Sequence, residues 1–148
     1  VDGPGTAAAY AKTPGDEFTA RLSPDGRWVA SLAAVNGKQD MQILSWPRPG
    51  ARYQLSLDFD LTYTEATWGE GGKSLVFTDA RKRLVTVPVQ LEGGFRQGAP
   101  RVLFTAGTWQ APLGVSPDLA RFLMLDIEPL SNPAPLRVLT YWPARLRQ

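Results

Sequence analysis

A turn that recurs at a nearly constant interval constrains the fold of this chain more than any other feature of its sequence. Ser-Pro-Asp-Gly-Arg-Trp at residues 23–28 is echoed by Ser-Pro-Asp at residues 116–118, and Gly-Glu-Gly-Gly at residues 69–72 stands between them. The three segments begin 46 and 47 residues apart. Each follows an apolar residue and precedes a run of bulky apolar residues, so each is predicted to be the turn of a β-hairpin.

The residue types in these turns have local structural roles. Proline presets φ, aspartate bonds nearby backbone, and glycine takes a positive φ at little steric cost. Asp25 and Asp118 are therefore expected to form turns rather than to act as catalytic acids. Leu119 stands where the first turn has Gly26, and the middle segment lacks Ser-Pro-Asp, so both later turns are expected to differ in type from the first.

A second echo follows each turn and completes the repeating unit. Apolar runs at residues 43–47, 84–88 and 138–143 each close with proline, as third strands would, and fourth strands are expected at 52–57 and 101–105. A period of about 40 to 45 residues is typical of a four-stranded propeller blade. With 14 Gly and 13 Pro spread along the chain, the sequence predicts an all-β fold of about three antiparallel blades.

The predicted blades cover residues 18–58, 62–105 and 109–143, and the last lacks its outermost strand. Residues 18–148 are thus predicted to form a partial β-propeller. Residues 1–17 are either a linker, which their composition favours, or the donor of a missing strand. Because propellers close with four to eight blades, we expect a larger propeller, or one completed by homo-oligomer formation through exposed blade faces.

Composition narrows the function classes. The chain has no His and no Cys, and its 16 basic residues nearly balance its 14 acidic ones. The usual general base, metal ligands and thiolate nucleophile are therefore missing. We expect no enzyme activity, no cofactor, no metal site and no nucleic-acid binding, and no apolar run approaches the roughly 20 residues that cross a bilayer.

If strands alternate in direction within each blade, the loops after second and fourth strands share one face. Loops on a rigid scaffold are where binding residues concentrate. Trp109 is the first candidate because an aromatic side chain offers a large contact area at low entropic cost; the alternative is that it packs between adjacent blades. The other ligand-binding candidates are Tyr63, Asp60, Asp79 and Arg81. The expected ligand is a protein, a peptide or a small polymer.

The ordered motifs resemble a known family. Ser-Pro-Asp-Gly-Arg-Trp, then Trp68 before a glycine-rich turn, then residues 94–104 and the closing residues 135–142, are similar to the WD40-like, TolB-type (PD40-like) propeller repeats of bacteria. They are especially similar to the C-terminal propeller of bacterial serine/threonine kinases.

The resemblance implies a non-catalytic binding or sensing module of a larger receptor-like kinase, in an extracytoplasmic location. Two alternatives stay open. One is a propeller that filters substrates for a peptidase or another hydrolase, and the other is a purely structural oligomerisation domain.

Overall fold

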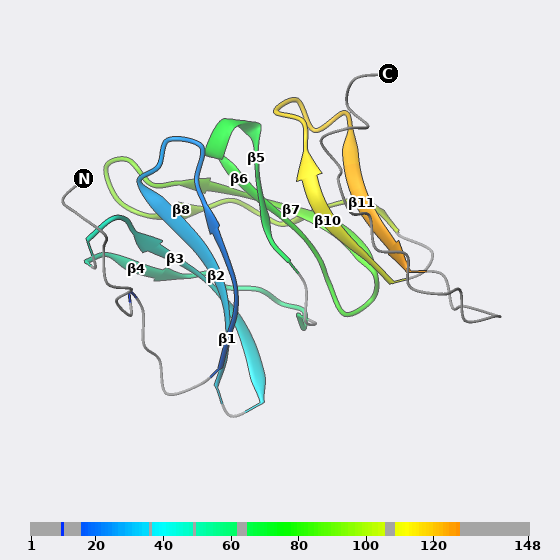
Figure 1. Cartoon of the computed structure of the whole chain (residues 1–148), viewed down its shortest axis with the longest axis horizontal. Coiled ribbons are helices and arrows are strands. Elements are labelled where there is room, and N and C mark those ends of the chain that lie inside the picture. Colours follow the sequence, from blue (N-terminus) through cyan, green and yellow to red (C-terminus); the bar gives the residue numbers. More distant parts are fainter. Residues whose placement is uncertain are drawn as a thin grey trace, which may run out of the picture.

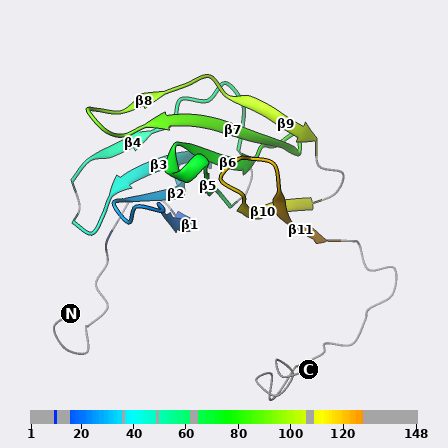
Figure 2. The ribbon, with the colours of Figure 1, turned by 90° about the horizontal axis from the view of Figure 1, so that it is seen from above.

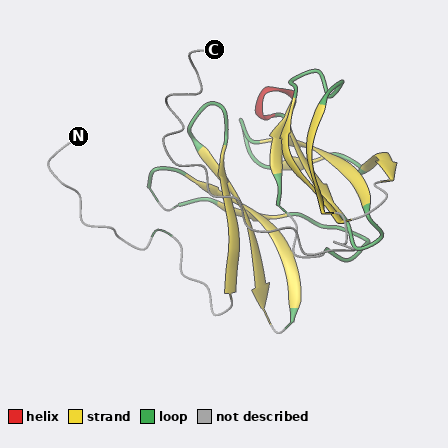
Figure 3. Cartoon of the chain, turned by 45° about the vertical axis from the view of Figure 1, so that its right-hand side comes forward, coloured by secondary structure: helices red, strands yellow, loops and turns green. Residues whose placement is uncertain are grey.

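The computed structural model of the chain describes residues 10, 16–35, 37–48, 50–61, 65–105 and 109–127, and these residues form an all-β fold of antiparallel sheets (Figure 3). The strands are β1 (Asp16–Leu22), β2 (Trp28–Val35), β3 (Lys38–Ser45), β4 (Arg52–Gln54), β5 (Thr67–Gly69), β6 (Ser74–Thr78), β7 (Arg83–Gln90), β8 (Arg96–Gln97), β9 (Arg101–Thr105), β10 (Trp109–Val115) and β11 (Phe122–Ile127). One 3-10 turn, η1 (Glu70–Gly72), joins β5 to β6.

The strands form three sheets that follow one another along the chain (Figure 1). The first sheet has the order β1-β2-β3-β4. In the second sheet β5, β6 and β7 pair in sequence, and the outer edge of β7 is shared by β8 and β9. The third sheet is the hairpin β10-β11. Seen from above, β1, β5 and β10 lie on one side and β4, β8 and β9 on the other (Figure 2).

The core lies between the first and second sheets. In the first sheet the register sets Leu32 opposite Met41, and both side chains are fully buried. In the second sheet Leu75 pairs with Val87, and Phe77 lies one step further along the same face. Because side chains alternate between the two faces of a strand, every second residue of these strands enters this core.

Trp68 joins the first two sheets. Its side chain is 8% exposed, and its indole Nε1 donates a hydrogen bond of 2.8 Å to the carbonyl of Arg21 on β1. The Arg21 guanidinium pairs with Glu65 just ahead of β5. At the other edge of the junction the rings of Tyr53 and Phe95 stack with centroids 4.8 Å apart. Both edges of this sheet junction are therefore tied by specific contacts.

The third sheet packs on the opposite face of the second, where β10 lies against β5 and β6. Val76 of β6 is fully buried on this face. Leu119, in the β10-β11 turn, reaches over Gly69: a Cβ placed on Gly69 would lie 2.9 Å from its Cδ2. The same Cβ would lie 2.8 Å from Ser74 Oγ, so Gly69 is required by the approach of Ser74 and Leu119 together.

The first and last turns share their backbone and serine–aspartate hydrogen bonds, which corrects the expectation that they differ in type. In each turn the serine hydroxyl donates to the aspartate Oδ1 over 2.5 Å, and the amide three residues after the serine donates to the serine carbonyl over 2.9 Å. Gly26 has φ 69° and Leu119 has φ 55°. Leucine accepts this left-handed conformation, which costs roughly 1–2 kcal/mol, where its side chain packs on the second sheet. The middle turn is different, since η1 occupies it.

The first turn predicts a pH effect. The Ser23 hydroxyl, followed by the side chain and amide of Arg27, lowers the pKa of Asp25 from 3.8 to about 2. A carboxyl whose pKa is lower when folded adds stability above its unfolded pKa, about 4, and loses it as the pH falls through its folded pKa.

We therefore expect the stability difference between wild type and Asp25→Asn to shrink as the pH falls from 5 toward 2. Ser23→Ala should raise the pKa of Asp25 toward its ordinary value, because the hydroxyl is the largest cause of the shift. Carboxyl NMR titration of wild type and of Ser23→Ala measures the pKa of Asp25 in each protein. An unchanged Asp25 pKa in Ser23→Ala would contradict the assigned cause.

Candidate functional site

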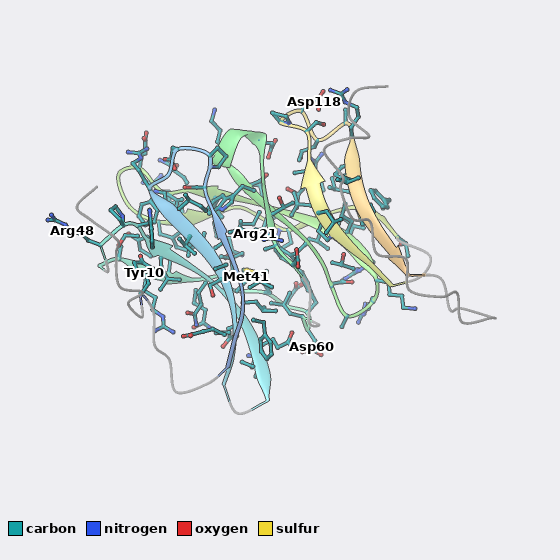
Figure 4. All side chains as sticks on the ribbon, in the orientation of Figure 1. Tyr10, Arg21, Met41, Arg48, Asp60 and Asp118 are labelled. Atoms are coloured by element: carbon teal, nitrogen blue, oxygen red, sulfur yellow. The ribbon has the colours of Figure 1, made fainter. Side chains whose placement is uncertain are left out.

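Three segments meet at one end of the two large sheets and form what we call the loop face. They are the β2-β3 turn, residues 55–61 after β4, and the β6-β7 turn, all in the lower part of Figure 1. Asp60 lies at this end, whereas Asp118 lies at the opposite end, in the β10-β11 turn (Figure 4). The expected meeting therefore holds for the loops after β2, β4 and β6, and the loop after β9 lies outside the described residues.

Two adjoining pockets open on the loop face. One has a volume of about 460 Å³ and is lined by the start of β3, Gln54 and residues 55–61. The other has a volume of about 360 Å³ and lies between residues 57–60 and the β6-β7 turn. Both are lined by Lys38, Leu57, Phe59 and Asp60. Their sizes fall in the range of roughly 300–1,000 Å³ that is usual for binding pockets.

The floor of the two pockets includes the apolar side chains of Leu57 and Phe59, and it is firmly held. Phe59 is half-buried, contacts the ring of Phe77 with centroids 6.4 Å apart, and has the Arg83 guanidinium 5.9 Å from its ring centroid. The Gln97 side chain accepts a hydrogen bond from the Ser56 amide over 2.9 Å and donates to the Ser56 carbonyl over 2.7 Å. These contacts bind residues 55–61 to the second sheet, so the floor is formed before any ligand arrives.

Asp79 lines the smaller pocket, but its carboxylate is used by its own hairpin. The residue is 1% exposed. Its Oδ1 accepts hydrogen bonds of 2.9 Å from the amides of Arg81 and Arg83, and its Oδ2 accepts 2.7 and 2.6 Å bonds from Nε and Nη2 of Arg83. The structure therefore gives Asp79 a turn-forming role, which explains why an acidic residue is tolerated at the end of a fully buried strand.

Asp60 and Arg81, two other predicted candidates, have exposed side chains at the rim of the smaller pocket. The Asp60 carbonyl accepts a 3.0 Å hydrogen bond from the Ala80 amide, and Leu61 bridges to Asp79. Among the described residues neither side chain forms an ion pair. The backbone thus fixes their positions and leaves their charges available.

The remaining two candidates are not placed at the site. Trp109 begins β10 and its backbone pairs with Ile127, but its side chain lies outside the described part of the structure, as does the whole of Tyr63. Sequence reasoning missed Leu57 and Phe59. The alternation of Leu55, Leu57, Phe59 and Leu61 with polar residues could have revealed them, because it continues the period of a strand beyond β4.

Comparisons with protein-family models, with curated proteins and with solved structures found no match. The described residues contain no helix long and apolar enough to cross a membrane. Within the same residues, no group of three or more acidic side chains is arranged to hold a metal ion. The chemistry of the site therefore has to be read from the pockets themselves: an apolar floor surrounded by lysine, arginine and aspartate side chains.

Proposed function

We propose that the chain is a non-catalytic binding module, built as successive blades of a β-propeller, that takes a protein, peptide or small-polymer ligand on its loop face. The observation that carries the proposal is the pair of adjoining pockets with a shared apolar floor and a charged rim. Apolar surface provides affinity, while a few placed polar groups fix the orientation of a ligand.

The blade interpretation is supported by the sheet arrangement. Two antiparallel sheets of four or five strands and one hairpin follow each other in the chain and stack face to face. Their first strands, β1, β5 and β10, lie on the same side (Figure 2), as the innermost strands of propeller blades do. On a propeller the loop face would be one of the two open ends, where ligands can reach it.

The proposal is tested by removing the rim charges. A triple variant, Lys38→Ala, Asp60→Ala and Arg81→Ala, should bind short immobilised peptides of varied sequence about tenfold more weakly than wild type, because it removes three charged side chains that would fix the orientation of a ligand over Leu57 and Phe59. All three side chains are exposed, so the fold should be retained.

A matched control removes two basic charges and one acidic charge away from the loop face: Glu70→Ala, Arg96→Ala and Arg101→Ala, all exposed. It should bind peptides as wild type does. Lys73 and Glu92 are kept, because they line a separate pocket of about 510 Å³ at the other end of the sheets. Equal peptide binding by wild type and the loop-face variant would exclude the loop face as the binding site.

A further inference from the structure

Large apolar side chains are exposed at the two ends of the sheet stack and not on the loop face. Among the described residues, those on the first sheet are Phe18 (40% exposed), Leu22 (53%) and Trp46 (40%), and those on the last hairpin are Leu113 (44%) and Leu123 (65%), while Val102 and Phe104 lie on β9. Clustered exposed apolar side chains mark interaction sites. The apolar surfaces at the two ends of the sheet stack are therefore separate from the loop face.

The first end of the stack contains a hole. On the outer face of the first sheet, a pocket of about 270 Å³ is lined by Tyr10, Phe18, Val29 and Leu44. The Tyr10 ring packs edge-on against Trp46 with centroids 4.8 Å apart. This contact holds Tyr10 in place as one side of the pocket. The volume is below the roughly 300 Å³ at which small-molecule sites begin. It suits an inserted aliphatic side chain better than a small-molecule ligand.

The other end of the stack presents a knob. Leu123, with 65% of its surface exposed, is the most exposed large apolar side chain among the described residues. Its neighbour in β11, Phe122, packs instead against Phe104, with ring centroids 5.3 Å apart. Leu113 is exposed at a bulge in β10, beside the pairing of Gly114 with Leu123. The β10-β11 hairpin is held by the contact of Phe122 with Phe104 and by the packing of β10 on β5 and β6. The two leucines therefore stay exposed.

We propose that the chain associates head to tail with a second copy of itself, Leu123 of one copy entering the Tyr10–Phe18 pocket of the next. The knob is on β11 and the hole is on the outer face of the first sheet, and β11 lies on the opposite side of the molecule from β1 to β4 (Figure 1), so neither can satisfy the other within a copy. A surface pocket and a separate apolar projection on one chain generate a heterologous contact. The contact continues the face-to-face sheet stacking already present inside the chain. It does not depend on the proposed loop-face binding.

The test exploits the asymmetry of a heterologous contact. Sedimentation velocity from micromolar to millimolar concentration should show wild type assembling beyond a dimer. Leu123→Glu loses the knob but keeps the hole, and Phe18→Glu loses the hole but keeps the knob, so each alone should stay monomeric. An equimolar mixture should form a heterodimer and stop there, because only one good knob and one good hole remain.

A matched control, Val102→Glu, places the same charge at an exposed aliphatic residue of β9 and should assemble like wild type. Circular dichroism checks that every variant is folded. A wild type that stays monomeric at millimolar concentration would overturn the proposal. So would variants that still self-associate alone, which indicates a different contact, and a mixture of folded variants that fails to pair, which excludes this knob and hole.

Discussion

Replacing Asp79 with alanine should lower the free energy of unfolding by about 3 kcal/mol or more, because removing one partner of a buried ion pair leaves the other without compensation. The carboxylate is 1% exposed and accepts four hydrogen bonds, two from the backbone and two from Arg83. Without it, two amides of the β6-β7 turn and a half-buried guanidinium lose their partner. Urea unfolding followed by tryptophan fluorescence measures the loss.

Two comparisons make this prediction specific. Asp79→Asn keeps an acceptor oxygen for the turn amides but removes the charge opposite Arg83, so its loss should be intermediate. Asp118→Ala removes a turn carboxylate that is exposed and bonded only within its own turn, so its effect should be much smaller. If Asp79→Ala were no more destabilising than Asp118→Ala, the carboxylate would not be the main organiser of the β6-β7 turn.

Trp68→Ala should destabilise the fold by about 3–5 kcal/mol, the usual range for truncating a large buried aromatic side chain. Trp68 packs in the core between the first and second sheets and is also hydrogen-bonded to β1. Its loss therefore removes both core volume and a contact that joins the sheets. Thermal unfolding followed by far-UV circular dichroism measures the effect without relying on the missing fluorophore.

Trp68→Phe separates the two contributions. It keeps most of the ring but leaves the Arg21 carbonyl without its donor, and a lost hydrogen bond of this kind costs about 1–2 kcal/mol. A loss as large as that of Trp68→Ala would mean that the hydrogen bond, rather than packing, dominates the junction. No loss in either variant would show that the sheets are held together elsewhere.

The hairpins were the most predictable part of the fold. Their turns fall at the Ser-Pro-Asp segments and at the glycine-rich segment, and the following strands start where the apolar runs start. This succeeds because turn chemistry and strand period are local properties of the sequence. Asp25 and Asp118 are confirmed as turn formers by their hydrogen bonds.

The candidate site was less predictable because it depends on contacts between distant segments. The pairing of residues 60 and 61 with the β6-β7 turn brings Asp60 near Arg81. No local sequence pattern predicts this pairing. Aspartate is a residue type common in loops, so the sequence predicts an exposed Asp79, whereas the strands packed around it bury its side chain. Leu119 shows the same limit in the fold: its side chain lies against Gly69, a residue 50 positions earlier in the sequence.

The contact between Leu119 and Gly69 also limits how the sequence can vary. A Cβ at position 69 would lie 2.8 Å from Ser74 Oγ and 2.9 Å from Leu119 Cδ2, so a side chain there would meet both the second and the third sheet. A smaller residue at position 119 would remove only one of these two contacts. Position 69 should therefore accept a side chain only when residues 74 and 119 change together, so the β10-β11 turn could not vary in sequence independently of the second sheet.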